Sequence, residues 1–507
     1  MKTALYILIS FLLVAFGQPA FSSFCSLVAA SLGYALIWKA LTPLPSKKHR
    51  FYAATAWFFA VQLVQLSWMT SIEFQGLYIL GVYAGLSLGL GLQFGLLSQW
   101  VDRFPHIAVA ALWTIFEWVR LFLLSGFTWN PVGLSLTASI YSLQMASIWG
   151  VLGLSYWVIL TNLAFWNKKY YAWGALTLVP YLFGVVQMSY RGPELDKSPR
   201  LSIALIQTGL LPSQKVPLQG RLEEFVSPYA QWEQILSLLQ PVHEPLDLIV
   251  LPEYAVPVVA ELPLYRGEAV QKIFEQKLGS VSEAIAGKVS NLFWMHKLAN
   301  HFSAEVVAGL DAQEGNQFFS SAFHVQPTTL SETRYDKQIL MPLAEYLPFT
   351  WLKTFTAAYG ITSFFTPGRE TKIFPSKVPF AVSICYEETF GHLMQHARQK
   401  GAELFINLTN DGWYPGTLLP QEHFDHGRVR AVENGIPLVR ACNTGVTAGV
   451  DSLGHVIGSL PDQTAAVLTL HVPTYKYFTL YSWWGNIGIL TICFFSLALL
   501  VRNIKIR

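Results

Sequence analysis

The first 190 residues alternate between long apolar segments and short polar connections. Each apolar segment is close to the ~20 residues that a membrane-spanning helix needs, so we predict that this part of the chain crosses a membrane repeatedly. The second segment follows the first within a few residues, without a small-residue cleavage site, so we expect a retained helix rather than a signal peptide. The predicted spans are 3–18, 22–42, 51–70, 76–99, 106–125, 138–165 and 171–190, with an eighth at 481–501.

A different pattern occupies the stretch between the seventh and eighth spans. Short runs rich in Val, Ile and Leu alternate there with amphipathic segments, which is typical of an α/β layered domain whose strands are covered on both faces. The expected strands are 200–207, 246–253, 304–312, 318–325, 378–385, 402–410, 436–443 and 465–472, and the expected helices are 219–240, 386–400 and 421–434. The sequence therefore predicts a seven-span transmembrane bundle at 1–190, an external α/β domain at 191–477, and an eighth span with its tail at 478–507.

The composition agrees with a polytopic membrane protein. The chain is 52% hydrophobic and only 13% charged, whereas soluble proteins carry about 25% charged residues. The net charge of +3 is too small to indicate a nucleic-acid partner, and we expect none. Four cysteines are too few for a disulfide framework, and we expect one of them, Cys442, to be buried in the core.

Basic residues are distributed unevenly over the loops of the predicted bundle. By the positive-inside rule, loops rich in Lys and Arg remain in the cytoplasm. This places both termini in the cytoplasm and the α/β domain outside, which in a bacterium with two membranes means an inner-membrane protein with its domain in the periplasm. The residues that set this orientation are Lys2, Lys47, Lys48, Arg50, Arg103, Lys168, Lys169, Arg502, Lys505 and Arg507.

Three polar residues at or near strand ends carry the candidate chemistry. Glu253 ends "LIVLPE", Lys337 lies in "RYDKQILMPLAEYLPF", and Cys385 ends "FAVSIC". Ends of strands are where α/β sheets build their sites. A thiol must lose its proton to act as a nucleophile, and the acidic residues that follow Cys385 oppose that loss. Glu253 can act as the general base, while Lys337 can stabilise the thiolate and then an oxyanion.

The order Glu–Lys–Cys within "LPEYAVP", "YDKQILMPLAEYLPF" and "ICYEETF" resembles the nitrilase superfamily. The predicted spans around an external domain, and the stretch 407–454, resemble its membrane branch, the apolipoprotein N-acyltransferases. The resemblance implies an α-β-β-α sandwich in which Glu253 is the base, Lys337 the oxyanion lysine and Cys385 the nucleophile. It also implies accessory residues near the site: Glu345, Tyr386 and Glu387. The sequence departs from the family pattern at Val216, Leu251, Leu343 and Ala344.

The resemblance also implies a reaction. A fatty acyl chain would pass from a membrane phospholipid to a thioester on Cys385. It would then pass to the N-terminal amine of a diacylated apolipoprotein, whose first residue is a diacylglyceryl-cysteine. No cofactor is expected, because the ester already carries the activation. One alternative is a membrane-anchored amidohydrolase that uses water as the acceptor. The other is a non-catalytic transporter or scaffold, although the bundle shows no inverted repeat of the transporter kind.

Two further sets of residues are candidates for contact with membrane lipid. Glu117 and Arg120 lie three apart on a predicted span, so they share a face; they form either an ion pair inside the bundle or a wall of the phospholipid head-group site. Trp351 and Phe355 belong either to the core or to a segment lying on the membrane. Four histidines have spacings that suit metal ligands, but no further ligand set surrounds them and we expect no metal: His392, His396, His423 and His426.

Overall fold

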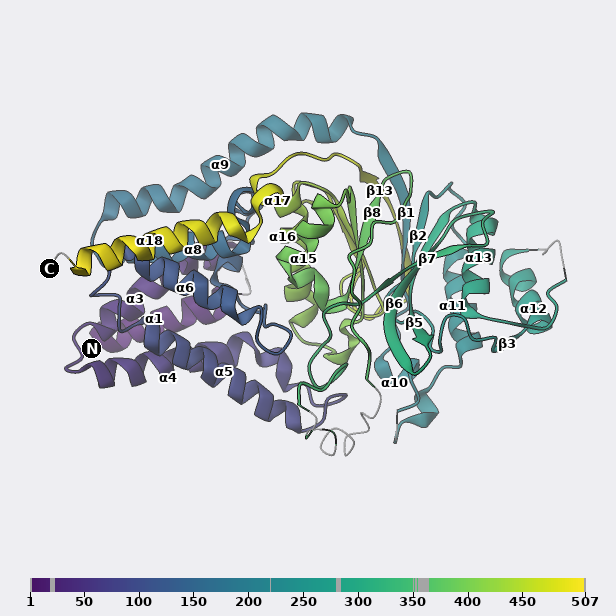
Figure 1. Ribbon diagram of the computed structural model, residues 1–507, viewed down its shortest axis with the longest axis horizontal. Helices are drawn as coiled ribbons and strands as arrows, with labels where there is room; N and C mark the ends of the chain where they lie inside the picture. Colours follow the sequence, from purple (N-terminus) through teal and green to yellow (C-terminus); the bar gives the residue numbers. More distant parts are fainter. Residues whose placement is uncertain are drawn as a thin grey trace.

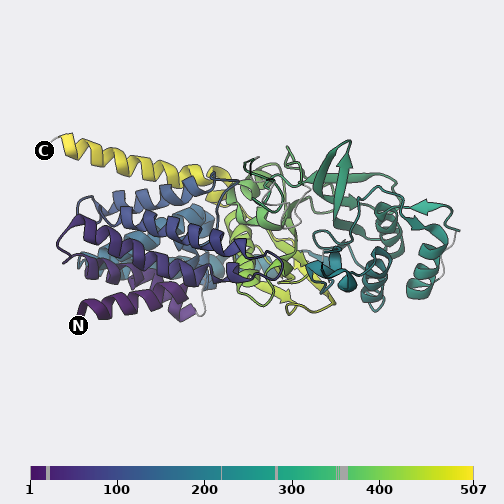
Figure 2. The same ribbon diagram turned by 90° about the horizontal axis from the view of Figure 1, so that it is seen from below.

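The computed structural model describes residues 2–18, 23–218, 220–279, 284–349, 351, 353 and 364–505. The molecule is elongated (Figure 1), with a helical bundle at one end and an α/β domain at the other. The described parts nearest both chain ends lie at the far end of the bundle in two perpendicular views (Figures 1 and 2). The α/β domain is therefore inserted between two helices of the bundle.

Helices rich in apolar residues form the bundle. They are α1 (Lys2–Gly17), α2 (Ser23–Val28), a π-helical turn η1 (Ala29–Gly33), α3 (Tyr34–Leu41), α4 (Lys47–Gln65), α5 (Tyr78–Leu97), α6 (His106–Arg120), α7 (Ile140–Leu143), α8 (Ala146–Trp166), α9 (Tyr170–Lys197) and α18 (Asn486–Lys505). Within the described residues, four helical stretches are long and apolar enough to cross a membrane, namely Ser23–Leu41, Tyr78–Leu97, Ala146–Trp166 and Tyr170–Lys197. The chain is thus a membrane protein.

Several helix ends differ from the predicted spans. The span predicted at 106–125 ends at Arg120, because the chain turns back through Leu124, Ser125 and Gly126, all with positive φ. In the span predicted at 138–165, the long helix α8 begins only at Ala146, after the single turn of α7. In contrast, α9 continues past the predicted end at 190 to Lys197. Apolar composition locates these helices, but contacts with the rest of the molecule decide where they stop.

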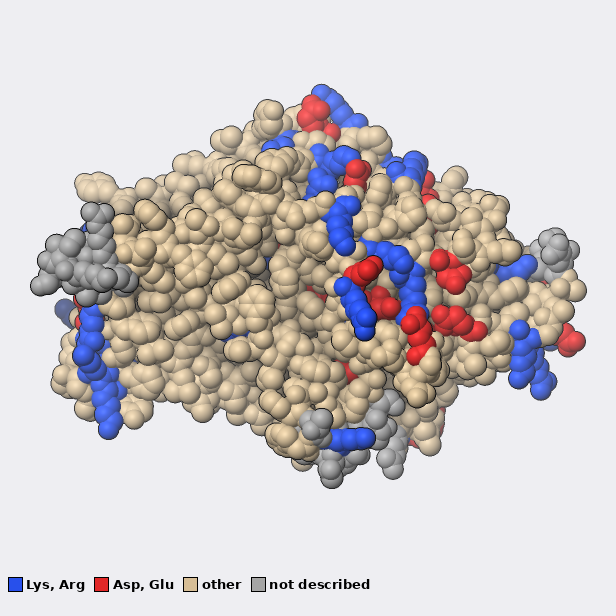
Figure 3. Space-filling model, viewed as in Figure 1, with Lys and Arg blue, Asp and Glu red and all other residues tan. Residues whose placement is uncertain are grey.

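The surface of the bundle is apolar on the face shown in Figure 3, and charged side chains gather over the α/β domain and at the far end of the bundle. Leucine, valine and phenylalanine side chains of the bundle helices are exposed, among them Leu92, Leu182, Val186, Phe494 and Phe495. Contiguous exposed apolar surface is unfavourable in water but matches a lipid environment. The bundle surface is therefore suited to lie within a membrane.

Two mixed sheets build the α/β domain. The first has the order β13 (Ala466–Pro473), β1 (Arg200–Gln207), β2 (Leu248–Val250), β5 (Glu305–Glu314), β6 (Gln317–Val325) and β7 (Glu332–Asp336). The second has the order β12 (Val456–Ser459), β11 (Ala448–Val450), β10 (Leu438–Cys442), β9 (Leu404–Thr409) and β8 (Phe380–Ile384). The short strands β3 (Tyr265–Arg266) and β4 (Lys288–Val289) form a separate antiparallel pair. Strands β1, β2 and β5 run parallel, as do β8, β9 and β10.

Helices cover the outer face of each sheet and the sheets face one another, which makes an α-β-β-α sandwich (Figure 1). The helices and turns of the domain are α10 (Pro212–Lys215), η4 (Leu222–Glu224), α11 (Pro228–Leu239), α12 (Gly267–Leu278), α13 (Asn291–Phe302), η6 (Cys385–Thr389), α15 (Gly391–Gln399), η7 (Asp411–Trp413) and α16 (Leu419–Asn434). The short helix α17 (Leu480–Trp484) follows the domain and leads into α18. Aliphatic side chains such as Ile203, Val250, Ile384 and Ile406 fill the space between the sheets. The predicted α/β domain is confirmed.

Most predicted strands are present within a few residues of their expected bounds, because their apolar runs are buried between two layers. Five strands were not predicted, namely β3, β4, β7, β11 and β12, and neither were α12 and α13. The helix expected at 219–240 begins only at Pro228, where Ser227 caps the first turn by accepting a hydrogen bond from Ala230 N at 3.3 Å.

The bundle and the domain meet close to Cys385. The hydroxyl of Tyr386 donates to the carbonyl of Gly126 at 2.9 Å, and the hydroxyls of Thr128 and Thr389 lie 2.7 Å apart. Gly126 has a φ of +101°, and a methyl group there would lie 2.5 Å from the ring of Phe390. The loop after α6 is thus fitted closely to the turn that carries Cys385.

We expect Gly126→Ala to lower the stability of the folded protein by about 2 kcal/mol or more, because it combines an unfavourable φ with overpacking. The measurement is the midpoint of thermal unfolding in detergent. Gly192→Ala is the matched control, since a methyl group in α9 at that position meets no atom within 4 Å. Equal midpoints for the two variants would contradict the close fit at Gly126.

Candidate active site

Glu253 lies just beyond the carboxyl end of β2, in a tight turn. Tyr254, the next residue, has a φ of +48°. The turn lies directly against Gly309 of β5, where a methyl group would come within 2.6 Å of the Glu253 Cα. Asn443 also holds the turn, because its side-chain amide donates to the Glu253 carbonyl at 2.5 Å. The absence of a side chain at Gly309 therefore allows the Glu253 carboxylate to be placed at this sheet edge.

Lys337 follows β7, which hydrogen-bonds with β6 at the edge of the first sheet. Its backbone N–H donates to the Ser320 carbonyl at 2.9 Å. The ammonium Nζ lies 2.6 Å from Glu345 Oε1 and 3.4 Å from Glu253 Oε1, and the side chain is only 1% exposed. A buried charge is tolerated only when it is paired, and here two carboxylates pair with one ammonium group.

Cys385 follows β8 directly and opens the 3₁₀ turn η6. Its φ is +53°, in the left-handed region that a residue with a side chain rarely adopts. This conformation places a half-buried thiol at the strand end, where the thiol and the carboxyl group of Glu253 affect one another's pKa. The structure therefore brings Glu253, Lys337 and Cys385 together from three separate strand ends.

Burial and neighbouring charges shift the pKa values of Glu253, Lys337 and Cys385 in opposing directions. Burial, and secondarily the Glu253 carboxylate, raise the pKa of the Cys385 thiol to about 12, although Lys337 lowers it. Burial raises the pKa of Glu253 against the opposing effect of Lys337. Burial alone would lower the pKa of Lys337, but Glu345 and Glu253 outweigh it and hold that pKa well above its ordinary value. The site thus holds a thiol whose ionisation is opposed by burial and by Glu253, next to an ammonium group that two carboxyl groups stabilise.

Glu387 fastens the Cys385 turn to the segment that carries Lys337. Its carboxylate accepts hydrogen bonds from the backbone N–H groups of Ile384 at 2.8 Å and Gln338 at 2.6 Å, and from the Tyr335 hydroxyl at 2.9 Å. Burial raises the pKa of Glu387 to about 6, although these backbone donors oppose the rise. Glu387 is a bridge between two sheets.

Sequence reasoning missed Asp311, which lies on β5 near the two carboxylates of the site. Burial, and then the charges of Glu253 and Glu345, raise the pKa of Asp311 to about 8. Its position in an apolar strand pattern was the only available signal, since a polar residue inside such a run is unusual.

A buried charged cluster behind Cys385 was also missed. It contains Glu388, Asp411, His423 and Arg440, which come from η6, η7, α16 and β10. Sequence spacing grouped His423 with three other histidines. In the structure, its ring instead contacts the backbone carbonyl of Cys385 at 3.2 Å.

An apolar surface of the bundle also contacts Cys385. Cys385, Met341 and Tyr414 pack against the bundle core, which includes Trp68 and Trp129. The rings of Trp68 and Tyr414 meet edge to face at 5.0 Å, and those of Trp68 and Trp129 at 5.2 Å. Cys385 is thus close to a charged set of residues and also packs against an apolar wall.

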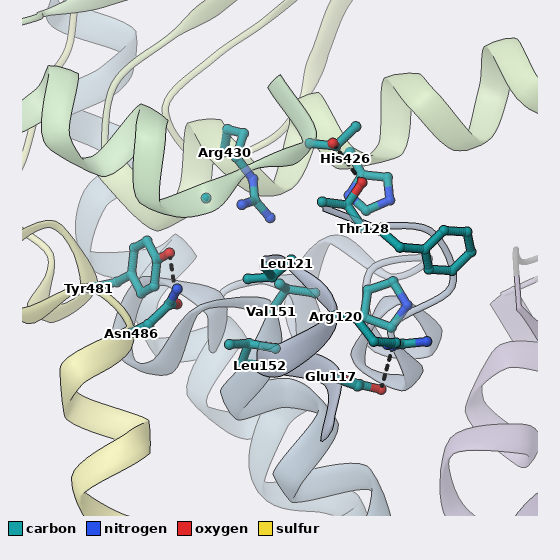
Figure 4. Close-up of a pocket in the computed structure, with 14 residues that line it drawn as sticks. Glu117, Arg120, Leu121, Thr128, Val151, Leu152, His426, Arg430, Tyr481 and Asn486 are labelled. Carbon is teal, nitrogen blue, oxygen red and sulfur yellow. Dashed lines mark hydrogen bonds and ion pairs between the residues drawn. The ribbon is translucent and has the colours of Figure 1, made fainter. Parts of the chain in front are cut away.

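Glu117 and Arg120 lie together near the end of α6, with an ion-pair distance of 3.8 Å. Both line a cavity between the bundle and the α/β domain (Figure 4), opposite Arg430 and His426 of α16. The same Glu117 carboxylate accepts hydrogen bonds from Trp113 Nε1 and Val132 N. Glu117 and Arg120 therefore form an ion pair, and the same two residues line a cavity.

Of the two aromatic residues expected at the membrane, only Trp351 is among the described residues. Trp351 is 73% exposed, and its ring stacks on that of Phe349 at 6.1 Å. Phe355 lies outside the described residues. Among the described residues, Trp351 does not belong to the core.

Comparison with known proteins agrees with this geometry. The carbon-nitrogen hydrolase family matches residues 202–476, and the apolipoprotein N-acyltransferase N-terminal domain matches residues 10–164. An apolipoprotein N-acyltransferase of Chlamydia caviae is 33% identical over 98% of this chain and 98% of its own length. Those of Chlamydia pneumoniae and Haemophilus ducreyi are 34% and 29% identical, each over 97% of this chain and 96% and 95% of their own lengths.

These matches confirm the resemblance read from the Glu, Lys and Cys motifs, and they favour an enzyme over a transporter or scaffold. The chain belongs to the apolipoprotein N-acyltransferase family, and it is an acyltransferase that N-acylates lipoproteins.

Proposed function

We propose that the enzyme takes its acyl chain from a membrane phospholipid and carries it as a thioester on Cys385. Glu253 accepts the thiol proton while the sulfur attacks the ester carbonyl carbon. The C–O bond then breaks, and Glu253 returns the proton to the departing lysophospholipid. In the second half, the N-terminal amine of a diacylated apolipoprotein attacks the thioester. Glu253 accepts the amine proton and passes it to the departing Cys385 sulfur, which leaves an amide.

The observation that carries this proposal is that Cys385 lies beside the charged residues and also packs against the apolar wall of the bundle. Lys337 lies 3.4 Å from the proposed base and is kept cationic by Glu345, so it is available to stabilise an oxyanion. The aromatic wall offers a surface on which an acyl chain can pack. Water as the acceptor would need neither the wall nor the bundle.

The division of the chain and its orientation are part of the same proposal. We assign residues 1–190 and 478–507 to a bundle of eight spans and residues 191–477 to a domain facing the periplasm. Helices of the described structure overlap the predicted spans, and four helical stretches long and apolar enough to cross a membrane support this assignment. The uneven distribution of Lys and Arg supports cytoplasmic termini.

We propose that the cavity lined by Arg120, between the bundle and the α/β domain, receives a polar part of the phospholipid (Figure 4). Exposed Trp351 is suited to the membrane interface, where aromatic side chains are enriched. We propose the same environment for Phe355.

We expect Cys385→Ala, Lys337→Met and Glu253→Gln each to reduce acyl transfer by at least about 10³-fold, because members of one catalytic unit fail together. Lys337→Met should in addition slow alkylation of Cys385 at pH 8, since loss of the cation raises the pKa of the thiol further. Both rates are measured on purified protein in detergent. Cys442→Ala, which changes a buried cysteine of the same domain, should keep most of the activity. If Cys442→Ala abolished acyl transfer while Cys385→Ala retained it, Cys385 would not be the nucleophile.

Protein given phospholipid without an acceptor should gain the mass of one fatty acyl group on the peptide that contains Cys385, because half-reactions through a covalent intermediate can be separated. Neutral hydroxylamine should remove this group, and a diacylated lipopeptide should discharge it as an N-acylated product. Discharge by water should be slow in comparison. Rapid loss without lipopeptide would favour the amidohydrolase, and product formation without any adduct would exclude the thioester.

The orientation predicts the outcome of reporter fusions. Alkaline phosphatase, which is active only outside the cytoplasm, should be inactive when fused after Lys169 and active when fused after Leu330. Leu330 is 94% exposed between β6 and β7, so the junction does not interrupt a strand. The reverse pattern of activity would place the domain in the cytoplasm and contradict the proposed orientation.

A further inference from the structure

The backbone carbonyl of Cys385 is held by two side chains. The Asn407 amide donates to it at 3.1 Å, and His423 Nε2 lies 3.2 Å from it. The other polar atom facing His423 Nε2 in the described structure is Glu388 Oε1, also at 3.2 Å. Both of these atoms are hydrogen-bond acceptors, so Nε2 carries a hydrogen and acts as a donor.

His423 is itself fixed by the buried charged cluster. Its Nδ1 lies 2.8 Å from Asp411 Oδ1 and 3.0 Å from Arg440 Nη2, and Arg440 Nη2 lies 2.6 Å from Asp411 Oδ2. Arg440 also forms an ion pair with Glu388. The side chains of these four residues are no more than 3% exposed. Such a network holds one geometry, because any displacement leaves a buried charge without its partner.

Holding this carbonyl has an effect across the peptide bond. The bond between Cys385 and Tyr386 is planar, so its C=O and N–H point in opposite directions. Fixing the oxygen of Cys385 therefore fixes the direction of the Tyr386 N–H. Tyr386 lies in the first turn of η6, where a helix leaves its first amides without intrahelical acceptors. The unfavourable φ of Cys385 also requires surrounding contacts to maintain it.

We propose that His423 is a positioning residue that aims the Tyr386 N–H at the oxyanion, where it acts together with Lys337. His423 does this by holding the Cys385 carbonyl, and the buried cluster holds His423. This inference rests on the proposed function, in which Cys385 is acylated through a tetrahedral intermediate.

Two rates separate positioning from simple support of the fold. Acylation of Cys385 by phospholipid passes through an oxyanion, whereas alkylation by iodoacetamide is a displacement at a saturated carbon without one. His423→Phe and His423→Asn remove the donor at the Nε2 position, while His423→Gln keeps an amide N–H near it. His324→Gln is the matched control, because His324 is a buried histidine on β6 that pairs with Glu305 at 2.8 Å.

We expect His423→Phe and His423→Asn to slow acylation by about 10- to 100-fold, less than the ~10²- to 10³-fold loss caused by removing an oxyanion donor outright. The phospholipid KM and the alkylation rate should stay within about twofold of the wild type. His423→Gln should recover most of the acylation rate, and His324→Gln should change neither rate.

Three results would overturn the inference. The first is an equal loss of acylation and alkylation in the folded His423→Phe or His423→Asn variant, which would mean that the cluster only supports the turn. The second is a folded His423→Gln variant as impaired as His423→Asn. The third is an unchanged acylation rate in every variant at His423. An unacylated wild-type Cys385 would instead overturn the proposed function itself.

Discussion

The buried ammonium group of Lys337 is the charge on which the whole site depends. An unpaired cation at this depth would be too costly, so the fold brings two carboxylates to it, one from the turn after β2 and one from the segment after β7. Glu345 lies closer than Glu253, which leaves Glu253 able to interact with the thiol of Cys385 as well. The position of the proposed base is thus a consequence of neutralising the lysine.

This arrangement also explains why the α/β domain has to be held so firmly. Lys337 and Cys385 come from different sheets, and Glu387 joins their segments through backbone N–H groups on both sides. The loop after α6 adds a contact from the bundle through Tyr386. A shift of the bundle relative to the domain would therefore act directly on the turn that carries the thiol.

The sequence was sufficient to predict the α/β class, most of the buried strands and the three polar residues at strand ends. It was insufficient for β11 and β12, whose short segments contain glycine and have little apolar periodicity, and for β7, which is largely polar. The surroundings of His423 could not be predicted either, because its partners come from distant parts of the chain. They are Cys385, Glu388, Asp411 and Arg440. Helix ends such as that of α6 depend on contacts with distant residues, which a local apolar pattern does not contain.

The pairing of β1 with β13 has a consequence for how the chain folds. These strands pair antiparallel along their whole length, from Arg200 with Pro473 to Gln207 with Ala466. During synthesis β1 is made long before β13, so one edge of the first sheet stays open while the rest of the domain is produced. Open edges of this kind promote aggregation, and pairings between distant segments form slowly. The domain is therefore vulnerable to misfolding for much of its synthesis. This period ends only when β13 pairs with β1 and closes that edge.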